Sequence, residues 1–280
     1  MQAGKGPPAG AHLRIRVLTE NQAMYPGFIA EKGLSILLDD GVSKVLFDTG
    51  QGGALLENAA AFGEDLQDLT HIVLSHGHAD HVGGLQRLAQ SLHATPYPQR
   101  PLLVTHPDSI AEQAPDAPAQ ILPRSAVQAA FPCQFTRAPF WLHPRLLFLG
   151  EIPRAPHGPQ APQGMRHAAH HADAPLLDDS ALAYCTPQGL VVLAGCAHSG
   201  ICNILAYAMQ VSGESRVLAV LGGFHLRNAG KAVLQRVAQY FNDLQITAVH
   251  ACHCSGERAA KLLPQQSAIH AGSELVFALS

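Results

Sequence analysis

The stretch Leu74-Ser75-His76-Gly77-His78-Ala79-Asp80-His81-Val82-Gly83-Gly84 decides how this chain of 280 residues is interpreted. Three His and one Asp fall within six residues, directly after a short apolar segment and at the start of a helical pattern. These side chains converge only where the backbone turns tightly, and Gly77 permits that turn. We predict that His76 and His78 share one metal ion and that Asp80 and His81 face a second one. The alternative is a surface loop that is rich in His by chance.

The composition is that of a folded globular protein with an excess of metal-binding side chains. Hydrophobic residues make up 47% and charged residues 14%, and the formal net charge is -3, which excludes a general attraction to nucleic acid or anionic lipid. Seventeen His are many for this length, and imidazole is the commonest transition-metal ligand. The six Cys form no disulfide framework, and no apolar run or leader segment is visible. We therefore expect a cytoplasmic protein that acts on a small-molecule substrate, with no nucleic-acid or membrane partner.

Hydrophobic periodicity predicts strands and helices in two similar runs. In the first half we predict strands at residues 13–19, 34–38 and 45–47, solvated on one face, a buried strand at 71–74, and helices at 53–62 and 81–92. In the second half we predict strands at residues 181–185, 189–194, 217–221, 246–250 and 274–279, and helices at 201–211, 231–242 and 257–263. Strand pairs followed by helices, twice over, indicate an α/β protein whose sheets carry helices on their outer faces.

The middle of the chain is rich in proline. Fifteen of the 20 Pro lie between residues 94 and 175. Because Pro lacks the N–H that a sheet requires and restricts the residue before it, no regular sheet is expected to run through this region. We predict a single domain over residues 1–280 with an insertion or substrate lid at about 94–175.

The histidine stretch resembles the His-x-His-x-Asp-His signature of the metallo-β-lactamase superfamily. Phe47-Asp48-Thr49-Gly50, upstream of it, is similar to the superfamily's strand-end Asp. This resemblance implies a four-layer αβ/βα sandwich, with Asp48 behind the metal ligands and orienting them by hydrogen bonds.

Within the superfamily the chain resembles the group related to the archaeal dihydropterin ribofuranosylaminobenzene phosphate synthase. The matching segments lie in order along nearly the whole chain: Glu20-Asn21, Glu31 to Ser35, Phe47 to Gly50, Ser75 to Gly84, Gly150 to Arg154, Asp178-Asp179, Gly195 to Gly200, Gly222 to Leu226 and His253 to Gly256. Lys32 departs from this group, which commonly has His at that position. The substrate of this chain therefore need not be that of the group.

Further metal ligands are expected where later strands end. The resemblance implies that His198 is the third ligand of the first metal and that His253, as the final superfamily His, binds the second. Cys196 occupies the place of a bridging Asp in many members; it is either a thiolate ligand or a small buried hydrophobe. Asp178 or its neighbour Asp179 either supplies a carboxylate ligand or caps a turn.

His225 follows two Gly after a strand and has three possible roles. It is a general acid that protonates a leaving group, a metal ligand, or a structural His. The nearby Cys252-x-Cys254 pair does not make a separate zinc site, because no second pair lies at zinc-finger spacing.

Two divalent cations held by His and Asp make hydroxide available near neutral pH, with Asp80 holding the nucleophile. Zn suits the ligands, with Fe(II) or Mn(II) as alternatives. We predict a hydrolase that acts through metal-bound hydroxide on a small phosphoester or ester. The resemblance implies an alternative, a dihydropterin-diphosphate-dependent transferase that releases pyrophosphate. A third hypothesis is a non-catalytic metal-binding ligand sensor.

Overall fold

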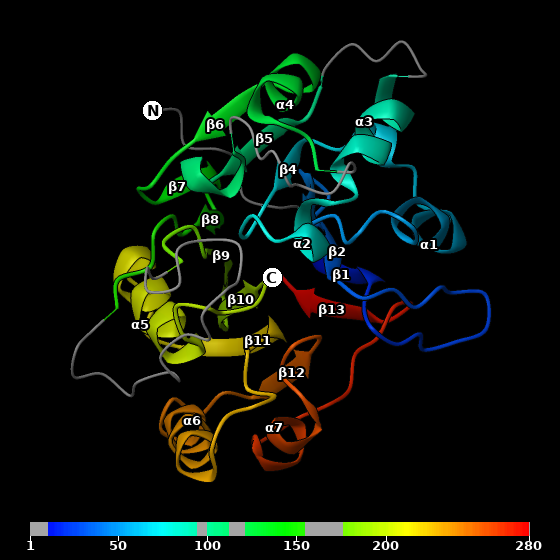
Figure 1. The fold of residues 1–280 in the computed structure, drawn as a ribbon. Coiled ribbons are helices and arrows are strands. Elements are labelled where there is room, and N and C mark those ends of the chain that lie inside the picture. Colours follow the sequence, from blue (N-terminus) through cyan, green and yellow to red (C-terminus); the bar gives the residue numbers. More distant parts are fainter. Residues whose placement is uncertain (1–10, 94–99, 112–120, 155–175, 280) are drawn as a thin grey trace. The chain divides into compact units, whose positions relative to one another are not determined.

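The computed structural model describes residues 11–93, 100–111, 121–154 and 176–279. The chain divides into two compact units: Met1–Thr136 together with Ile269–Ser280 form the first, and Arg137–Ala268 form the second. Each unit contains one mixed sheet and its own helices (Figure 1).

The sheet of the first unit has seven strands in the order β13-β1-β2-β3-β4-β5-β6. The strands are β1 (His12–Thr19), β2 (Ser35–Asp39), β3 (Lys44–Phe47), β4 (His71–Val73), β5 (Leu102–Thr105), β6 (Cys133–Phe135) and β13 (Glu274–Ala278). Neighbours from β13 to β3 are antiparallel, and those from β3 to β6 are parallel. Strand β1 alternates as predicted only as far as Val17, and its last three positions are all buried. Strands β2 and β3 are buried at four of five and three of four positions, so neither is solvated on one face as predicted.

Apolar residues of the helices pack against this sheet. The helices are α1 (Leu55–Ala61), η1 (Leu66–Asp68), α2 (Ala79–Val82), α3 (Leu85–His93), η2 (Pro107–Ser109) and α4 (Arg124–Ala130). Leu55, Leu88 and Val127 of three helices share one buried cluster with Leu46 and Ile72 of the sheet.

The predicted helix at residues 81–92 is interrupted, and α2 and α3 are separate. A Cβ atom at Gly84 would lie 2.1 Å from the carbonyl oxygen of Thr49, and one at Gly83 would lie 2.9 Å from that of Gln51. Two glycines are therefore required here because the backbone of the loop after β3 approaches closely.

The second unit has a six-stranded sheet in the order β12-β11-β10-β9-β8-β7. The strands are β7 (Phe140–His143), β8 (Leu146–Phe148), β9 (Ala181–Thr186), β10 (Gly189–Ala194), β11 (Val217–Gly223) and β12 (Ala248–Cys252). Strands β10, β11 and β12 run parallel, and the remaining neighbours are antiparallel.

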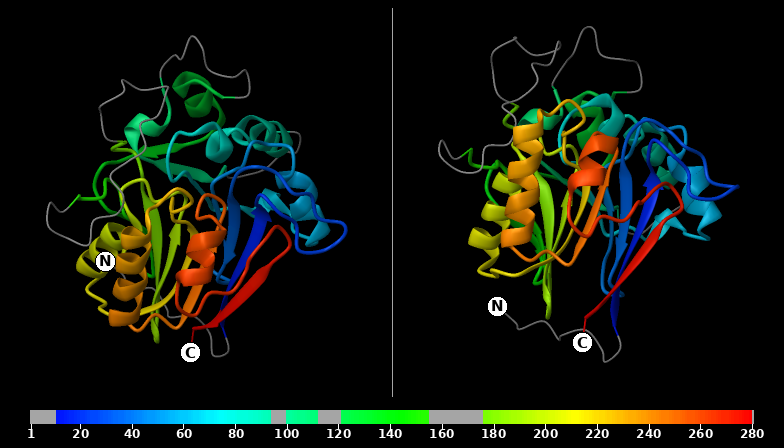
Figure 2. Two further views of the ribbon diagram at one scale, coloured as in Figure 1. Left: turned by 60° about the horizontal axis from the view of Figure 1, so that its bottom comes forward. Right: turned by 90° about the horizontal axis from the view of Figure 1, so that it is seen from below.

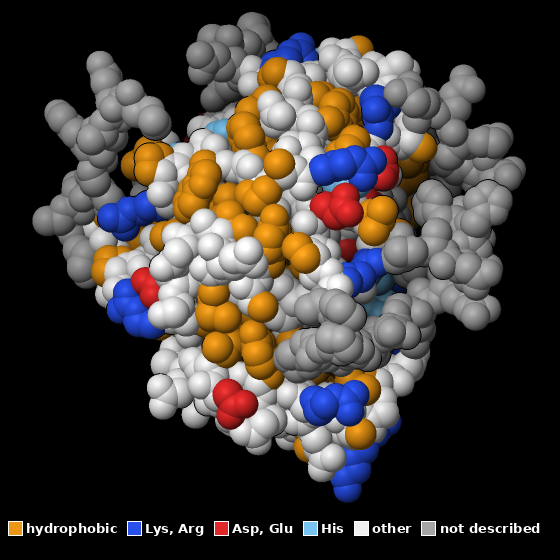
Figure 3. Space-filling view, turned by 90° about the vertical axis from the view of Figure 1, so that its left-hand side faces the viewer, with side chains coloured by type: hydrophobic (Ala, Val, Ile, Leu, Met, Phe, Trp, Pro, Cys, Tyr) orange, Lys and Arg blue, Asp and Glu red, His pale blue; other side chains and the backbone are white. Residues whose placement is uncertain are grey.

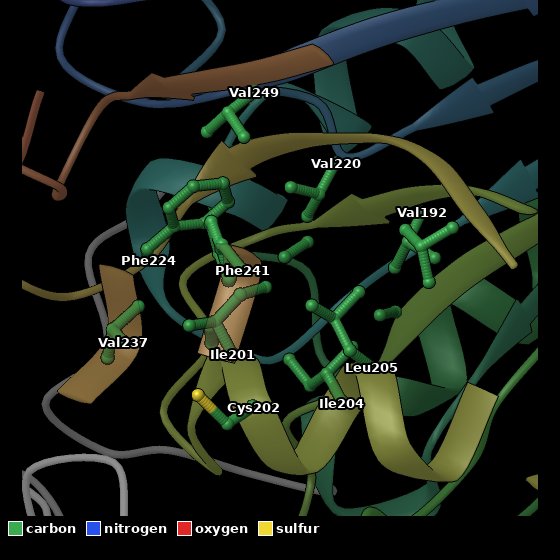
Figure 4. Packing of buried hydrophobic residues seen from close by; sticks show 14 of the residues in the cluster. Val192, Ile201, Cys202, Ile204, Leu205, Val220, Phe224, Val237, Phe241 and Val249 are labelled. Carbon is green, nitrogen blue, oxygen red and sulfur yellow. The ribbon is translucent and has the colours of Figure 1, made fainter. Parts of the chain in front are cut away.

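Helices α5 (Ile201–Ser212), α6 (Lys231–Asp243) and α7 (Glu257–Leu262) complete the second unit. Helices α5 and α6 lie side by side in both views of Figure 2. Ile201 and Leu205 of α5 belong to the same buried cluster as Val192 and Val220 of the sheet (Figure 4). The aromatic ring of Phe241 on α6 meets that of Phe224 edge to face, with centroids 6.0 Å apart. Each unit thus supplies one helical layer and one sheet layer.

The proline-rich region contributes strands to both sheets, so the expectation that no sheet runs through it is wrong for its described part. Pro101, Pro132 and Pro139 stand directly before strands β5, β6 and β7, and Pro144 lies in the turn between β7 and β8. At these positions the missing N–H interrupts no ladder. Residues 155–175, which include much of the predicted lid, lie outside the described residues.

Charged residues make up 14% of the sequence. On the face shown in Figure 3, hydrophobic side chains are widespread, and Lys, Arg and acidic side chains lie singly or in small groups between them. Among the described residues, no helix combines the length and apolar character needed to cross a membrane.

Candidate functional site

The predicted site residues of the first unit follow the ends of parallel strands. Strands β3, β4 and β5 run in register, with Phe47 opposite Val73 and Ile72 opposite Leu103. The loops after them therefore leave the same edge of the sheet, the position where α/β proteins commonly place their sites. These loops contain Asp48 and the stretch from His76 to His81.

Three imidazoles lie against one another in this first group. The ring centroids of His76 and His78 are 4.5 Å apart, and those of His76 and His81 are 4.2 Å apart. His76 Nε2 lies 2.9 Å from His78 Nδ1. His76 and His81 are completely buried, whereas His78 is only partly buried. Polar rings that are gathered and buried in this way are costly unless they have a common partner.

Gly77 is needed for a different reason from the one predicted. Its φ is not in the left-handed region, so the turn itself does not demand glycine. A Cβ atom at this position would instead lie 2.4 Å from the carbonyl oxygen of Ser109. Close approach of the loop after β5 therefore excludes a side chain between the two histidines.

Asp48 is fully buried and holds the histidines in one protonation pattern. Its carboxylate accepts hydrogen bonds from Ser75 N and Ser75 Oγ, each at 2.7 Å, and lies 2.7 Å from His81 Nδ1. Because a carboxylate only accepts, His81 carries its proton on Nδ1 and keeps the Nε2 lone pair. Ser75 Oγ gives its proton to Asp48 and so accepts from His76 Nδ1, at 2.8 Å. Nε2 of His76 therefore also keeps its lone pair.

The predicted residues of the second unit also follow parallel strands. Ala194 at the end of β10 pairs with Gly222 of β11, and Gly223 pairs with Cys252 of β12. The three loops that follow contain Cys196 and His198, then His225, then His253 and Cys254. The register of the strands thus gathers side chains that are up to 58 residues apart in sequence.

Cys196, His225 and Cys254 form a compact group with ligand atoms within 4.8 Å of one another. The backbone N–H of His225 donates to Cys254 Sγ at 3.3 Å. The ring centroids of His225 and His198 are 4.5 Å apart. His225 and Cys196 were predicted from the sequence, but Cys254 was not, because only the pairing of β11 with β12 brings Cys254 to His225.

The Cys254–His225 pair favours its charged form. A hydrogen bond to Cys254 raises the pKa of His225, and burial opposes this shift. Burial by itself raises the pKa of Cys254, but hydrogen bonds with Cys196 and His225 and the nearby His253 outweigh it and hold that pKa well below its usual value. In such a pair the imidazolium is a proton donor, and the neighbouring thiolate is the anion that stabilises it.

Asp179 braces the histidine loop of the second unit. Asp179 Oδ2 accepts hydrogen bonds from the backbone N–H of Ser199 at 2.9 Å and from its hydroxyl at 2.5 Å. Burial raises the pKa of Asp179 to about 6, against the opposing effect of these bonds. This arrangement repeats that of Asp48 with Ser75. The signal in the sequence is an Asp before a strand together with a Ser next to a loop His, which by itself is too common to identify the pair.

Four residues in these loops adopt a left-handed backbone that is uncommon for side chains larger than glycine. The φ angles are 60° at Asp48, 53° at Ala197, 51° at His225 and 50° at His253. Such conformations cost free energy and are found where surrounding structure enforces them, often at functional sites. All four lie in the loops that hold the predicted ligands or their supports.

Comparisons with known proteins agree with this architecture. The family model described as the metallo-beta-lactamase superfamily matches residues 30–236. One relative is a 7,8-dihydropterin-6-methyl-4-(beta-D-ribofuranosyl)-aminobenzene-5'-phosphate synthase from Methanocaldococcus jannaschii. The two sequences are 25% identical over a region that covers 95% of this chain and 97% of the synthase. It is 28% identical to an uncharacterised protein of the same archaeon, over 90% of this chain and 94% of that protein.

A solved structure is also similar over nearly its whole length. It is described as a metal-dependent hydrolase of the beta-lactamase superfamily, with 28% identity, a TM-score of 0.77, and coverage of 95% of this chain and 99% of that one. The predicted α/β fold of the metallo-β-lactamase type is confirmed. With the family model matching well over half of its residues, the chain belongs to the metallo-β-lactamase superfamily.

Proposed function

We propose that this protein is a hydrolase that uses two divalent cations, Zn first among them, to cleave a small phosphoester or ester. The observation that carries the proposal is the imidazole group held by Asp48. Zn–N bonds of about 2.0–2.1 Å at a tetrahedral angle place two ligand nitrogens about 3.3 Å apart. His76 Nε2 and His78 Nδ1 lie 2.9 Å apart as a hydrogen-bonded pair, slightly closer than this spacing, and a cation bound by both nitrogens would take the place of the shared proton. The donor set therefore fits such a cation.

Each predicted residue has a defined task in this proposal. His76, His78, Asp80 and His81 would hold the cations from the first unit. His198 and His253 of the second unit stay predicted ligands, with Cys196 and Asp178 as possible ones. When bound, the cations would lower the pKa of a coordinated water to about 7 and polarise the substrate.

The remaining residues orient groups and move protons. Asp48 fixes the tautomers of His76 and His81, so that neither ring must reorganise when it binds. Asp80 would accept a hydrogen bond from the attacking nucleophile. His225, whose pKa is raised by its hydrogen bond with Cys254, would donate a proton to the leaving group. In support of hydrolysis, a similar structure is described as a metal-dependent hydrolase.

Metal analysis of the protein and of single variants tests the ligand assignment. We expect His76→Ala or His78→Ala to lose at least one equivalent of bound metal, because each ring supplies a large share of one cation's ligands. His93→Ala, at the exposed end of α3, is the matched control and should keep the full metal content. An unchanged metal content in both ligand variants would disprove the assignment.

A substrate screen separates hydrolysis from the alternatives. We expect turnover of phosphodiesters or lactones, and a loss of orders of magnitude in Asp80→Asn while the first metal stays bound. The transferase alternative is supported by the related archaeal synthase. It predicts pyrophosphate release from a dihydropterin diphosphate only when an acceptor is present. Metal binding without any turnover would favour the sensor.

A further inference from the structure

The backbone next to Lys32 is held against Asp80. The N–H of Leu34 donates to the carbonyl oxygen of Asp80 at 3.2 Å. Gly33 has φ +138°, and a Cβ atom there would lie 2.4 Å from the same oxygen. The N–H of Gly33 also donates to Asn21 Oδ1 at 3.3 Å. The segment that carries Lys32 is therefore held directly against the Asp80 turn.

The ammonium group of Lys32 is loosely paired and open to solvent. Its Nζ lies 3.6 Å from Asp80 Oδ2, and 73% of its side chain is exposed. This separation exceeds normal hydrogen-bond length, and exposed pairs of this kind contribute only about 0–1 kcal/mol. Lys32 can therefore exchange Asp80 for another anion at little cost.

The neighbouring carboxylates are already engaged with other partners. Glu31 accepts hydrogen bonds from four consecutive backbone N–H groups, those of residues 51–54, at distances of 2.5–3.2 Å. Glu20 is buried and accepts from the N–H of Gln22 at 2.8 Å. Among the described residues, Asp80 is the carboxylate with which Lys32 forms an ion pair.

An Asp80 carboxylate that binds a divalent cation no longer offsets the charge of Lys32. The positive charge at the edge of the turn then attracts an anion, whereas a neutral ester gains nothing from it. We propose that Lys32 determines specificity by binding the anionic group of the substrate, and that phosphate-bearing substrates are therefore preferred over neutral esters. This inference rests on the proposed hydrolase function and assigns its substrate class.

Calorimetric titration of the zinc-loaded protein with inorganic phosphate tests the inference without turnover. We expect Lys32→Met to bind phosphate about tenfold more weakly, equivalent to about 1.4 kcal/mol, and Lys32→Arg to bind nearly as well as the unaltered protein. Lys261→Met is a matched control, because Lys261 is 74% exposed and lies 3.7 Å from Glu257. Unchanged phosphate affinity in Lys32→Met would overturn the inference.

Zinc affinity separates a substrate role from a structural one. Removing a cation beside Asp80 should leave zinc binding equal or tighter in Lys32→Met, because the carboxylate loses a competing partner. If Lys32→Met instead loses zinc, Lys32 supports the metal site and the inference is wrong.

The preference for phosphate-bearing substrates over neutral esters is then measured with two substrates that share one leaving group. In Lys32→Met, kcat/KM for bis(p-nitrophenyl) phosphate should fall about tenfold, mainly through KM, while kcat/KM for p-nitrophenyl acetate stays unchanged. An equal loss on both substrates would refute a role in specificity. If neither substrate is cleaved by the unaltered protein, the proposed function fails, and phosphate titration still decides whether Lys32 binds the anion.

Discussion

Replacing Asp48 by Asn should weaken metal binding while changing the shape of the site very little. The amide keeps one oxygen, so it can accept from Ser75 N or face His81 Nδ1, but not both. If its NH₂ group faces His81, it donates to Nδ1 and moves the ring proton to Nε2, which removes the lone pair that a metal needs. If the amide is reversed, two donors meet at Ser75 N. In the unaltered protein the Asp48 carboxylate makes three contacts of 2.7 Å, and either arrangement of the amide disturbs them.

The expected size follows from these contacts. Hydrogen bonds to a charged group contribute about 1.5–3 kcal/mol each, and at least one is lost in Asp48→Asn. Changes to groups that orient metal-binding His typically cost about 10–100-fold in metal affinity. Asp48→Ala leaves the buried donors of Ser75 and His81 without the carboxylate and should reduce the free energy of unfolding by about 1–3 kcal/mol.

Zinc titration and urea unfolding of the metal-free protein measure the two effects. Asp39→Asn is the control, because Asp39 caps an exposed turn through the N–H of Gly41. It should change the free energy of unfolding by no more than about 0.5 kcal/mol. Zinc affinity in Asp48→Asn equal to that of the unaltered protein would show that Asp48 does not set the histidine tautomers.

Three further predictions concern single residues. The pKa of Asp179 is raised by burial from 3.8 to about 6, so the free energy of unfolding of the metal-free protein should fall as pH rises between these values. The folded state holds the proton longer there than the unfolded state, and Asp179→Asn should remove this part of a pH series of urea unfolding curves. Gly84→Ala should destabilise the fold by about 1–3 kcal/mol, because the new Cβ atom would clash with the carbonyl oxygen of Thr49. Gly230→Ala is the control and should not destabilise the fold, because the space around its Cβ position is open; thermal unfolding measures both variants. Burial raises the pKa of Cys202 to about 12, so iodoacetamide at pH 8 should label this thiol only after unfolding, as peptide mass spectrometry would reveal.

The sequence by itself determined those features that depend on neighbours along the chain. The alternation in β1 and the helical spacing in α5 and α6 are local, and the predicted segments agree with these elements. The histidine stretch lies within six residues, so its convergence follows from a single loop. The superfamily could be predicted because its histidine signature is also local, and the match of the family model confirmed it.

Tertiary structure decided the features that depend on distant backbone. Gly83 and Gly84 interrupt the expected helix because the loop after β3 lies against them, and Gly77 is required by Ser109 rather than by its own turn. The prolines of the middle region proved compatible with sheets because they stand at strand ends, which composition does not reveal.

The supports of the candidate site also came from pairing over long distances. Asp179 braces Ser199 across 20 residues because β9 begins beside the end of its antiparallel neighbour β10. Cys254 reaches His225 across 29 residues because the parallel strands β11 and β12 end at one edge of the sheet. Lys32 faces Asp80 because backbone contacts at residues 33 and 34 fix its loop. Spacing along the chain identifies which residues can do chemistry, whereas strand register and close backbone approach determine which of them meet, since both depend on contacts that no local pattern encodes.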